Sequence, residues 1–173
     1  VLPHISQSVK RRPSPYPHGD RLATLDYIRD SDYIHFTDTT PRDFTQSNSG
    51  NRFRLAEDRL IGPYLDNVGY FSIENGGGAH FHVAMMANMT YPFEEAKEWN
   101  SFAPKTFKQL LVRSTNVLGY TPQPSNLMRK TGEMICEYYQ VVRCFDFLNH
   151  IENMRPIAEV VLSHRDVIFE PAI

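Results

Sequence analysis

The stretch YIHFTDTTPRDFTQS, residues 33–47, begins with aromatic and β-branched side chains and turns polar after six residues. Such side chains favour strands, whereas the TTPRD that follows suits a loop. Four later runs repeat this pattern, at residues 68–73, 107–112, 140–145 and 166–169, with starts 26 to 39 residues apart. That spacing leaves room for one helix between consecutive strands, so the sequence predicts repeated strand–helix units and a parallel sheet.

Four segments between these strands carry apolar residues at helical spacing. They are residues 54–61, 92–99, 126–139 and 151–162. We expect Gly62 and Pro63 to end the first helix, and Pro156 to kink the fourth or delay its start. Five strands and four helices fit either a small doubly wound sheet or the first five strands of a TIM (β/α)8 barrel, and the pattern alone does not choose.

The composition bounds what the chain can be. With 173 residues, 41% of them hydrophobic, it is long enough for one domain with a sizeable core. A net charge of −2 gives no general attraction to nucleic acid or to an anionic membrane. No apolar run approaches the roughly 20 residues of a membrane-spanning helix, and no signal peptide is recognisable. Cys136 and Cys144 lack zinc or redox spacing, so we expect core thiols in a soluble, cytoplasmic protein.

The first 22 residues form a separate region. Pro3, Pro13, Pro15 and Pro17 disfavour a helix or a central strand, so we expect an extended arm over residues 1–22 and the domain over residues 23–173. The basic triplet Lys10-Arg11-Arg12 has no aromatic residues around it, and we assign it no nucleic-acid function. The chain starts without Met and stops directly after a strand-like run, which suggests a piece of a longer protein.

Polar residues follow every predicted strand. In both candidate architectures, ligands bind beyond the carboxyl ends of the parallel strands, so these residues are the candidates for chemistry. They include carboxylates, arginines, an amide and two histidines, expected at one rim. The segments are residues 37–46, 74–82, 113–116 and 146–149, with Glu170 after the last strand.

Four ordered motifs carry a family resemblance. They are TDTTPRDFTQS at 37–47, ENGGGA at 74–79 with VAM at 83–85, LVR at 111–113 with Asn116 and GYT at 119–121, and VRCFD at 142–146 with LN at 148–149 and NM at 153–154. In order and spacing they resemble the carboxyltransferase domain of biotin-dependent enzymes, the family of pyruvate carboxylase, oxaloacetate decarboxylase and transcarboxylase. The resemblance runs from about Phe36 to the end of the chain.

The resemblance implies a TIM barrel, of which this chain holds about the first five strands, and a site for carboxyl transfer between carboxybiotin and a 2-oxo acid such as pyruvate. It implies that Asp43 ligates a divalent metal (Zn, Mn or Co), a role suited to a hard carboxylate. Arg113 would clamp the substrate carboxylate, because guanidinium can donate two parallel hydrogen bonds. Arg42 and Gln46 match positions that contact the substrate or the developing enolate oxygen.

The same resemblance implies several partners. Biotin would arrive on a carrier domain or a separate subunit, and the remaining metal ligands and a proton-shuttling threonine would come from later strands. We therefore expect the remainder of the barrel as a partner, a homodimer or higher oligomer, and an isolated fragment without activity. Two alternatives stay open: a metal-dependent aldol-type lyase or synthase on the same barrel, and a non-catalytic assembly fragment.

The sequence departs from the family pattern at three places. Thr45 stands where the family commonly has His, and Gly76 stands where many members have Trp, so substrate choice is open. His80-Phe81-His82 replaces a common Thr-Phe-Asp, and the two imidazoles lie on the same side if the segment is extended and diverge if it is helical. The two histidines could bind metal, support the rim, or serve ordinary packing.

Other residues of these motifs have simpler interpretations. We expect Asp146 and Asn149 to hold loops by hydrogen bonding. The glycines at 76–78 suit a tight strand-to-helix turn, because no Lys-Ser/Thr follows to make a phosphate loop. Met85, Met86 and Met89 are expected to fill the core.

Overall fold

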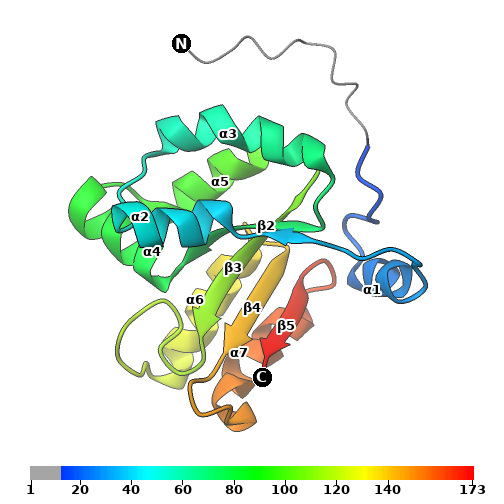
Figure 1. Cartoon of the computed structure of the whole chain (residues 1–173). Helices are drawn as coiled ribbons and strands as arrows, with labels where there is room; N and C mark the ends of the chain where they lie inside the picture. The colour runs from blue at the N-terminus through cyan, green and yellow to red at the C-terminus, as the bar shows by residue number, and fades with distance from the viewer. Residues whose placement is uncertain (1–12) are drawn as a thin grey trace.

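The computed structural model describes residues 13–173, which fold into a curled parallel sheet flanked by helices (Figure 1). The five strands lie in chain order and every neighbouring pair is parallel. A doubly wound sheet reverses its strand order part-way, whereas a (β/α) barrel does not. The strands are β1 Thr37–Asp38, β2 Ser72–Gly77, β3 Phe107–Arg113, β4 Val141–Phe145 and β5 Ile168–Ala172. The chain is therefore a five-stranded half-barrel, as the sequence predicts.

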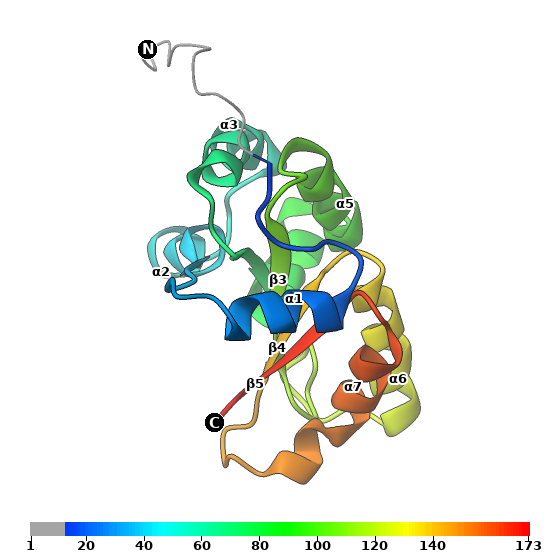
Figure 2. The same ribbon diagram turned by 90° about the vertical axis from the view of Figure 1, so that its right-hand side faces the viewer.

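The longer helices cover the outer face of this sheet, with α6 and α7 behind β3–β5 (Figures 1 and 2). The largest buried cluster lies there, where Leu110, Val112 and Val142 meet apolar residues of α5, α6 and α7. The helical elements are α1 Arg21–Arg29, η1 Thr40–Phe44, α2 Thr45–Ser49, α3 Leu55–Val68, α4 Gly78–Val83, η2 Ala84–Asn88, α5 Pro92–Phe102, α6 Ser125–Cys136 and α7 Ile151–Ser163. Cys136 and Cys144 are buried thiols, as predicted, and burial raises the pKa of each to about 12.

The end of α3 differs from the prediction. The helix continues through Gly62 and Pro63 to Val68 and stops at Gly69, whose φ of 95° is left-handed. Gly62 is required by packing: a Cβ there would lie 2.3 Å from the ring of Phe102, so it lets α3 approach α5 closely. Pro156 likewise lies inside α7 and does not delay its start.

The first two strands are displaced from their predicted positions. Only Thr37 and Asp38 pair as β1, while Tyr33 and Ile34 are each 81% exposed. The run 68–73 splits between the end of α3 and the start of β2, which continues through Gly77. Apolar content marked these regions correctly, but pairing extends into a more polar segment, in which Thr37, Ser72 and Glu74 point into the barrel while Ile73 packs outward against Trp99.

The prediction that Met85, Met86 and Met89 fill the core is wrong. They are 49%, 70% and 83% exposed, respectively. The helix that follows β2 changes from α to π geometry at Ala84, which breaks the 3.6-residue period on which the prediction relied.

The arm is only partly described. Residues 13–20 contain no helix or strand, and α1 then begins at Arg21, capped by the Asp20 carboxylate. Arg21 donates to the carbonyls of His164 and Val167, which ties α1 to the end of α7. The basic triplet at 10–12 lies outside the described residues. Within residues 13–173, no helix is long and apolar enough to cross a membrane.

The buried Lys108 should make the stability of the fold depend on pH. Its ammonium donates to the carbonyls of Ala103 and Thr106, and burial lowers its pKa to about 8 from 10.5. Between these values the unfolded chain binds more protons than the folded chain, so the free energy of unfolding should rise with pH. Above about pH 9 the buried thiols of Cys136 and Cys144 act in the opposite direction, because they ionise in the unfolded chain first. The contribution of Lys108 is therefore measured against Lys108→Met: between about pH 7.5 and about pH 10, the free energy of unfolding of the wild type should rise by up to about 3 kcal/mol relative to that variant, as urea unfolding measures.

Two lysine variants isolate this contribution. Lys108→Met removes the titrating group and should lack this relative rise, whereas Lys97→Met, at a side chain that is 67% exposed, should respond to pH as the wild type does. An equal rise in the wild type and in both variants would show that Lys108 is not its source.

Candidate active site

Three of the predicted site residues meet at the carboxyl ends of the strands. A hollow of about 140 Å³ opens there between the end of β2, the end of β3 and the two short helices that follow β1. Its lining comprises Arg42, Gln46, Gly77, Gly78, Ala79, Leu111, Arg113 and Phe145. Asp43 is not in the lining; its side chain is 58% exposed beside Arg42, whose Nη1 lies 3.1 Å from Asp43 Oδ1.

The turn after β1 sets the position of Arg42. Pro41 occupies the first turn of η1, where its missing N–H costs nothing. The buried Thr45 hydroxyl donates back to the carbonyls of Pro41 (2.7 Å) and Arg42 (3.0 Å). Thr45 therefore fixes the backbone of the turn and holds no position in the hollow.

Glu74 anchors the Arg42 side chain. Its carboxylate is fully buried; Oε1 accepts from Arg42 Nε at 2.5 Å, and Oε2 accepts from Arg143 Nη1 at 3.1 Å. Two guanidinium groups thus share one buried carboxylate, and Arg143 also pairs with Glu170 at 2.6 Å. A buried carboxylate requires such partners, because an unpaired one would be strongly disfavoured.

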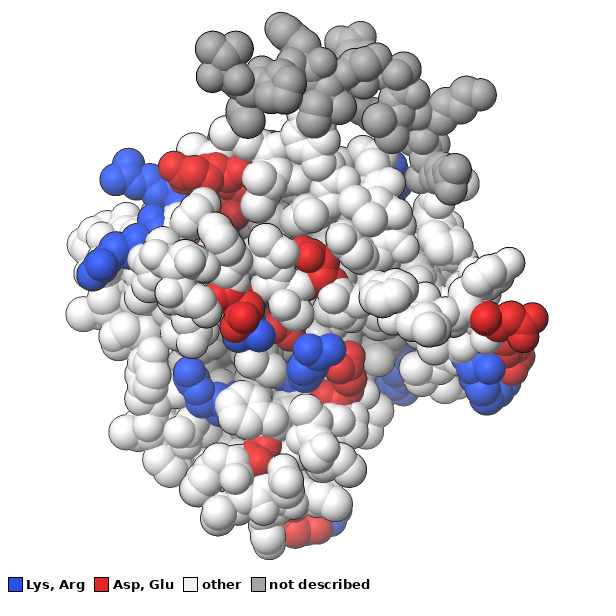
Figure 3. All heavy atoms as spheres, in the orientation of Figure 1, with Lys and Arg blue, Asp and Glu red and all other residues white. Residues whose placement is uncertain are grey.

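This network extends across all five strands. Gln109 on β3 donates to Glu74 (3.1 Å) and accepts from Ser72 on β2 (2.7 Å). Ser72 in turn contacts the hydroxyl of Thr37 on β1 at 2.8 Å. Together with Arg143 on β4 and Glu170 on β5, these side chains link every strand along the inner face of the sheet. Figure 3 shows acidic and basic atoms interleaved on this face, with no patch of a single sign.

Arg113 is held differently, without a carboxylate. Its Nη1 donates to the carbonyl of Gly119 at 3.0 Å, and its guanidinium carbon lies 4.8 Å from the centre of the Tyr120 ring. Within the described residues no Asp or Glu pairs with it, so its charge stays available to a ligand. A Cβ on Gly78 would lie 2.3 Å from Arg113 Nη1, so a glycine is needed for this close approach.

The loop after β3 stores strain next to Arg113. Val117 is buried and has a φ of 50°, a left-handed conformation that is unfavourable for a β-branched residue. The backbones of Val117 and Arg113 exchange two hydrogen bonds, of 2.8 Å and 2.5 Å. This closed loop fixes the backbone of Arg113. It also places the Gly119 carbonyl and the Tyr120 ring against the Arg113 side chain.

Comparison with known proteins identifies the family. No family model matches the chain. It is 37% identical over 130 residues to mitochondrial pyruvate carboxylase of Rattus norvegicus, a match that spans 73% of this chain and 11% of that protein. It is 32% identical over 139 residues to pyruvate carboxylase of Staphylococcus aureus, spanning 79% of this chain and 12% of that protein. The 2-oxoglutarate carboxylase large subunit of Hydrogenobacter thermophilus is 31% identical over 129 residues, spanning 74% of this chain and 20% of that protein.

Solved structures agree with this result. The carboxyl transferase domain of Rhizobium etli pyruvate carboxylase with 3-bromopyruvate has a TM-score of 0.82 and 27% identity, covering 97% of this chain and 31% of that one. The same domain with oxamate and biotin has a TM-score of 0.80 and 28% identity, covering 95% and 30%. This chain belongs to the pyruvate carboxylase family of carboxyltransferase domains. It spans only 11% and 12% of the length of the two pyruvate carboxylases compared.

In this carboxyltransferase fold the two histidines after β2 do not act as a pair. They lie in helix α4, and residues two apart on a helix point to different sides. His80 Nε2 lies 3.0 Å from the carboxylate of Glu95, whereas His82 packs edge-on against Tyr120, with ring centres 5.3 Å apart. Burial raises the pKa of Glu95, but hydrogen bonds from His80 and Thr90 outweigh it and leave the pKa lowered.

Asp146 holds a loop of the carboxyltransferase fold, as predicted. Its carboxylate accepts from Ser114 at 2.5 Å, and from the backbone N–H of His150 and the amide of Asn153, each at 3.0 Å. These bonds, with that of Ser114 the largest, lower the pKa of Asp146 to about 2. Asn149 has a φ of 55°, a conformation that asparagine tolerates well.

The fit of a divalent metal can be tested on the donor groups. The exposed Asp43 carboxylate is a hard oxygen donor next to the hollow, and its partner Arg42 leaves Asp43 Oδ2 unengaged by any described group. Among residues 13–173, no three His, Cys, Asp or Glu side chains come together as a complete metal site. Asp43 therefore fits as one ligand of a set whose other members lie elsewhere.

Proposed function

We propose that this chain contributes to a site that transfers a carboxyl group between carboxybiotin and a 2-oxo acid such as pyruvate. The observation that supports it most is Arg113, a cation without a carboxylate partner among the described residues, at a small hollow that also contains Arg42 and Gln46. The family membership supports the same activity.

Arg113 would bind the carboxylate of the 2-oxo acid. A guanidinium can offer two parallel N–H donors to a carboxylate, and charge-assisted bonds of this kind are the strong ones. The Tyr120 ring on its face and the Gly119 carbonyl restrict its rotation, so little side-chain entropy remains to be lost on binding. The hollow of about 140 Å³ suits a substrate of few atoms.

Arg42 and Gln46 would act on the reacting end of the substrate. Loss of a proton from the carbon next to the carbonyl places negative charge on the carbonyl oxygen, and donors already aimed at that oxygen stabilise the charge as it forms. Glu74 keeps Arg42 in place before the substrate arrives, so no reorganisation is needed during the reaction.

Asp43 would hold a divalent metal together with ligands from outside the described residues. When bound, such a metal supplies a Lewis acid that polarises the substrate carbonyl. We further propose that biotin arrives on a carrier domain or subunit, that the remainder of the barrel closes the site, and that the protein is a homodimer or higher oligomer.

A carboxyl-exchange assay tests the proposed function. The full-length protein should exchange labelled carboxylate between oxaloacetate and pyruvate, and avidin should abolish the exchange by capturing biotin. Exchange that survives saturating avidin would instead support a biotin-independent lyase or synthase on the same barrel.

Asp43→Asn should release the metal. Replacing a charged ligand by a neutral amide should weaken metal affinity by at least about 100-fold, as even indirect partners of metal ligands contribute 10- to 100-fold. Elemental analysis of the dialysed full-length protein measures this without an activity assay. Asp30→Asn, a matched change at an exposed carboxylate that pairs with Arg29, should retain the metal. Equal metal content in both variants would contradict the assignment of Asp43.

A further inference from the structure

We propose that Arg143 is a positioning residue for carboxyl transfer, which acts on Arg42 through the carboxylate of Glu74. The inference rests on the proposed function, because it concerns the arginine that would stabilise the developing negative charge. It goes beyond that function in assigning a role in the reaction to a side chain that does not line the hollow.

Arg143 lies one strand away from the hollow, on the same face of the sheet. In the register of β3 and β4 it is the partner of Leu111, which lines the hollow. Arg143 Nη1 donates to Glu74 Oε2 at 3.1 Å, and Arg42 Nε donates to Glu74 Oε1 at 2.5 Å. Among the described residues, Glu74 is the only group that hydrogen-bonds both arginines, so an effect of Arg143 on Arg42 passes through this carboxylate.

The second oxygen of Glu74 is occupied by other donors, and this limits how Arg42 can bind. Arg143 and Gln109 both donate to Oε2, each at 3.1 Å. A guanidinium often binds a carboxylate with two parallel N–H groups, one to each oxygen. Because Oε2 already accepts two bonds, Arg42 contacts Glu74 through Nε alone. Its Nη1 contacts Asp43 at 3.1 Å, and within residues 13–173 its Nη2 has no hydrogen-bond partner. Arg143 thus leaves Arg42 with N–H groups that a substrate can use.

Arg143 is itself held by the next strand. Its Nε donates to Glu170 at 2.6 Å, and Glu170 is its register partner on β5. Its two contacts go to two different carboxylates, one on each side of β4. The positions of β4 and β5 are therefore passed on to Glu74, and from Glu74 to Arg42.

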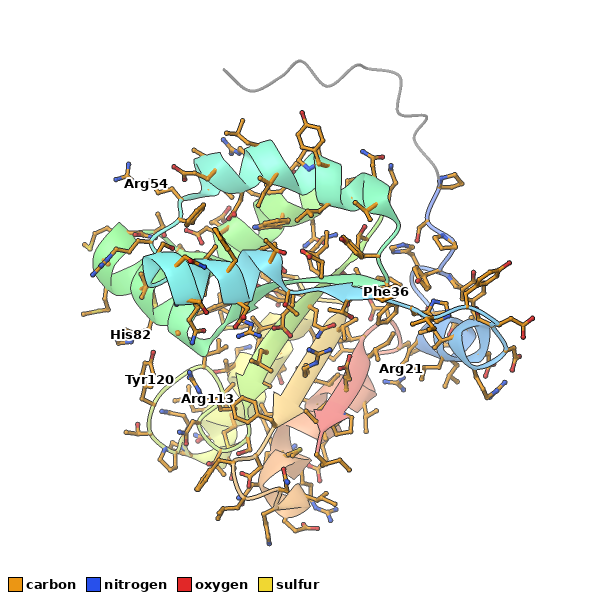
Figure 4. The ribbon with its side chains drawn as sticks, in the orientation of Figure 1. Arg21, Phe36, Arg54, His82, Arg113 and Tyr120 are labelled. Atoms are coloured by element: carbon orange, nitrogen blue, oxygen red, sulfur yellow. The ribbon has the colours of Figure 1, made fainter. Side chains whose placement is uncertain are left out.

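The second arginine of the hollow stands outside this series of contacts. Arg113 lies next to Tyr120 at the carboxyl end of β3 (Figure 4), and no hydrogen bond or ion pair of the described residues links it to Glu74 or Arg143. Loss of Arg143 should therefore disturb Arg42 and leave substrate binding by Arg113 intact. Loss of an interaction made only in the transition state lowers kcat and kcat/KM equally and leaves KM unchanged.

Arg143→Met in the full-length protein tests the inference. The substitution removes both contacts of Arg143 and leaves Glu74 with Arg42 and Gln109 as partners. In the carboxyl-exchange assay kcat should fall about 10-fold, a part of the 10²- to 10³-fold cost of removing a whole charge-stabilising donor. KM for the 2-oxo acid and Kd for oxamate, a non-reacting analogue, should stay within about twofold of the wild type. Titration calorimetry with oxamate also counts the binding sites, so kcat is expressed per folded site.

A double-mutant cycle tests the route through Arg42. If Arg143 acts through Arg42, adding Arg143→Met to Arg42→Lys should lower kcat by no more than about twofold further. A further loss as large as that in the wild-type background would mean that the two residues act independently, and the inference would be wrong.

Two other arginine variants complete the experiment. Arg155→Met is the matched control, because Arg155 is exposed and pairs with Glu152 within α7, and it should keep the wild-type kinetics. If Arg143→Met does not fold, Arg143→Lys takes its place in the same cycle, because it keeps a positive charge beside Glu74. One ammonium cannot reproduce the two contacts of the guanidinium, so kcat per site should still fall about threefold.

The outcomes separate this inference from the proposed function. A wild-type kcat per site in the Arg143 variant would overturn the inference while exchange by the wild type upholds the proposed function. A rise in KM and in Kd for oxamate as large as the loss in kcat would also overturn it, because the change would then have disrupted the whole site. If the wild type shows no exchange, the proposed function fails, and this inference fails with it.

Discussion

Arg113→Lys is expected to lower kcat/KM for the 2-oxo acid by about 100-fold. Lysine keeps the positive charge but presents a point charge in place of two parallel donors. The change removes one charge-assisted hydrogen bond, worth about 1.5–3 kcal/mol, and the stacking on Tyr120, worth about 0.5–2 kcal/mol. A loss of about 3 kcal/mol corresponds to two orders of magnitude in rate.

The experiment is the carboxyl-exchange assay with the full-length protein at varied 2-oxo acid concentration. Arg129→Lys is the matched control, because Arg129 pairs with Glu159 on the outer surface and its side chain is 48% exposed. That variant should keep the wild-type kinetics. Wild-type exchange in Arg113→Lys would remove the main support for the proposed site.

The sequence predicts best those elements whose apolar residues face the core. β3, β4, α5 and α7 begin within one residue of their predicted starts, because their outward side chains pack under helices and carry a clear period. β1 and β2 lie further along the chain than predicted, because several of their paired residues, such as Thr37 and Ser72, are polar and point into the barrel. The predicted end of α3 comes too early, because Gly62 followed by Pro63 is typical of a helix end. In the structure Gly62 instead allows α3 to pack closely against α5.

The sequence also predicts some features of the candidate site and not others. The predicted Arg42, Gln46 and Arg113 meet at one hollow, because motifs at the ends of parallel strands share one rim. The link from Glu74 to Arg143 and Glu170 was not predicted, since it depends on the register of strands up to about 100 residues apart in the chain. One feature of the sequence could have indicated this link. Glu74 and Glu170 directly follow the predicted second and fifth strands, and Arg143, a possible ion-pair partner for both, lies within the fourth.

The different partners of Arg42 and Arg113 suggest that the two arginines of the hollow have different roles. Arg42 is neutralised by Glu74 and fixed in place, so it can stabilise charge that appears during the reaction. Arg113 is fixed by a carbonyl and a ring, which do not cancel its charge, so it can bind an anion that is present from the start.

Glu74→Gln is expected to lower the free energy of unfolding by about 3–5 kcal/mol and to abolish most of the exchange activity. The neutral amide leaves Arg42 and Arg143 facing each other without the buried carboxylate that they share, and removing one partner of a buried ion pair has this effect. Arg42 would then keep only its contact with the exposed Asp43, at 3.1 Å, and could turn away from the substrate. Urea unfolding and the exchange assay measure the two effects separately.

Two further variants keep this expectation testable if Glu74→Gln does not fold. Glu74→Asp keeps the charge, but with one methylene fewer its carboxylate cannot contact Arg42 and Arg143 together, so activity should fall by more than stability does. Glu170→Gln removes a carboxylate that is 35% exposed and, among residues 13–173, pairs with Arg143 alone, so it should lower stability by about 1 kcal/mol or less. If Glu74→Gln and Glu170→Gln lower the free energy of unfolding and the exchange activity by the same small amount, Glu74 is not the anchor of Arg42. The position of Arg42 in the hollow would then be set by the turn after β1 alone.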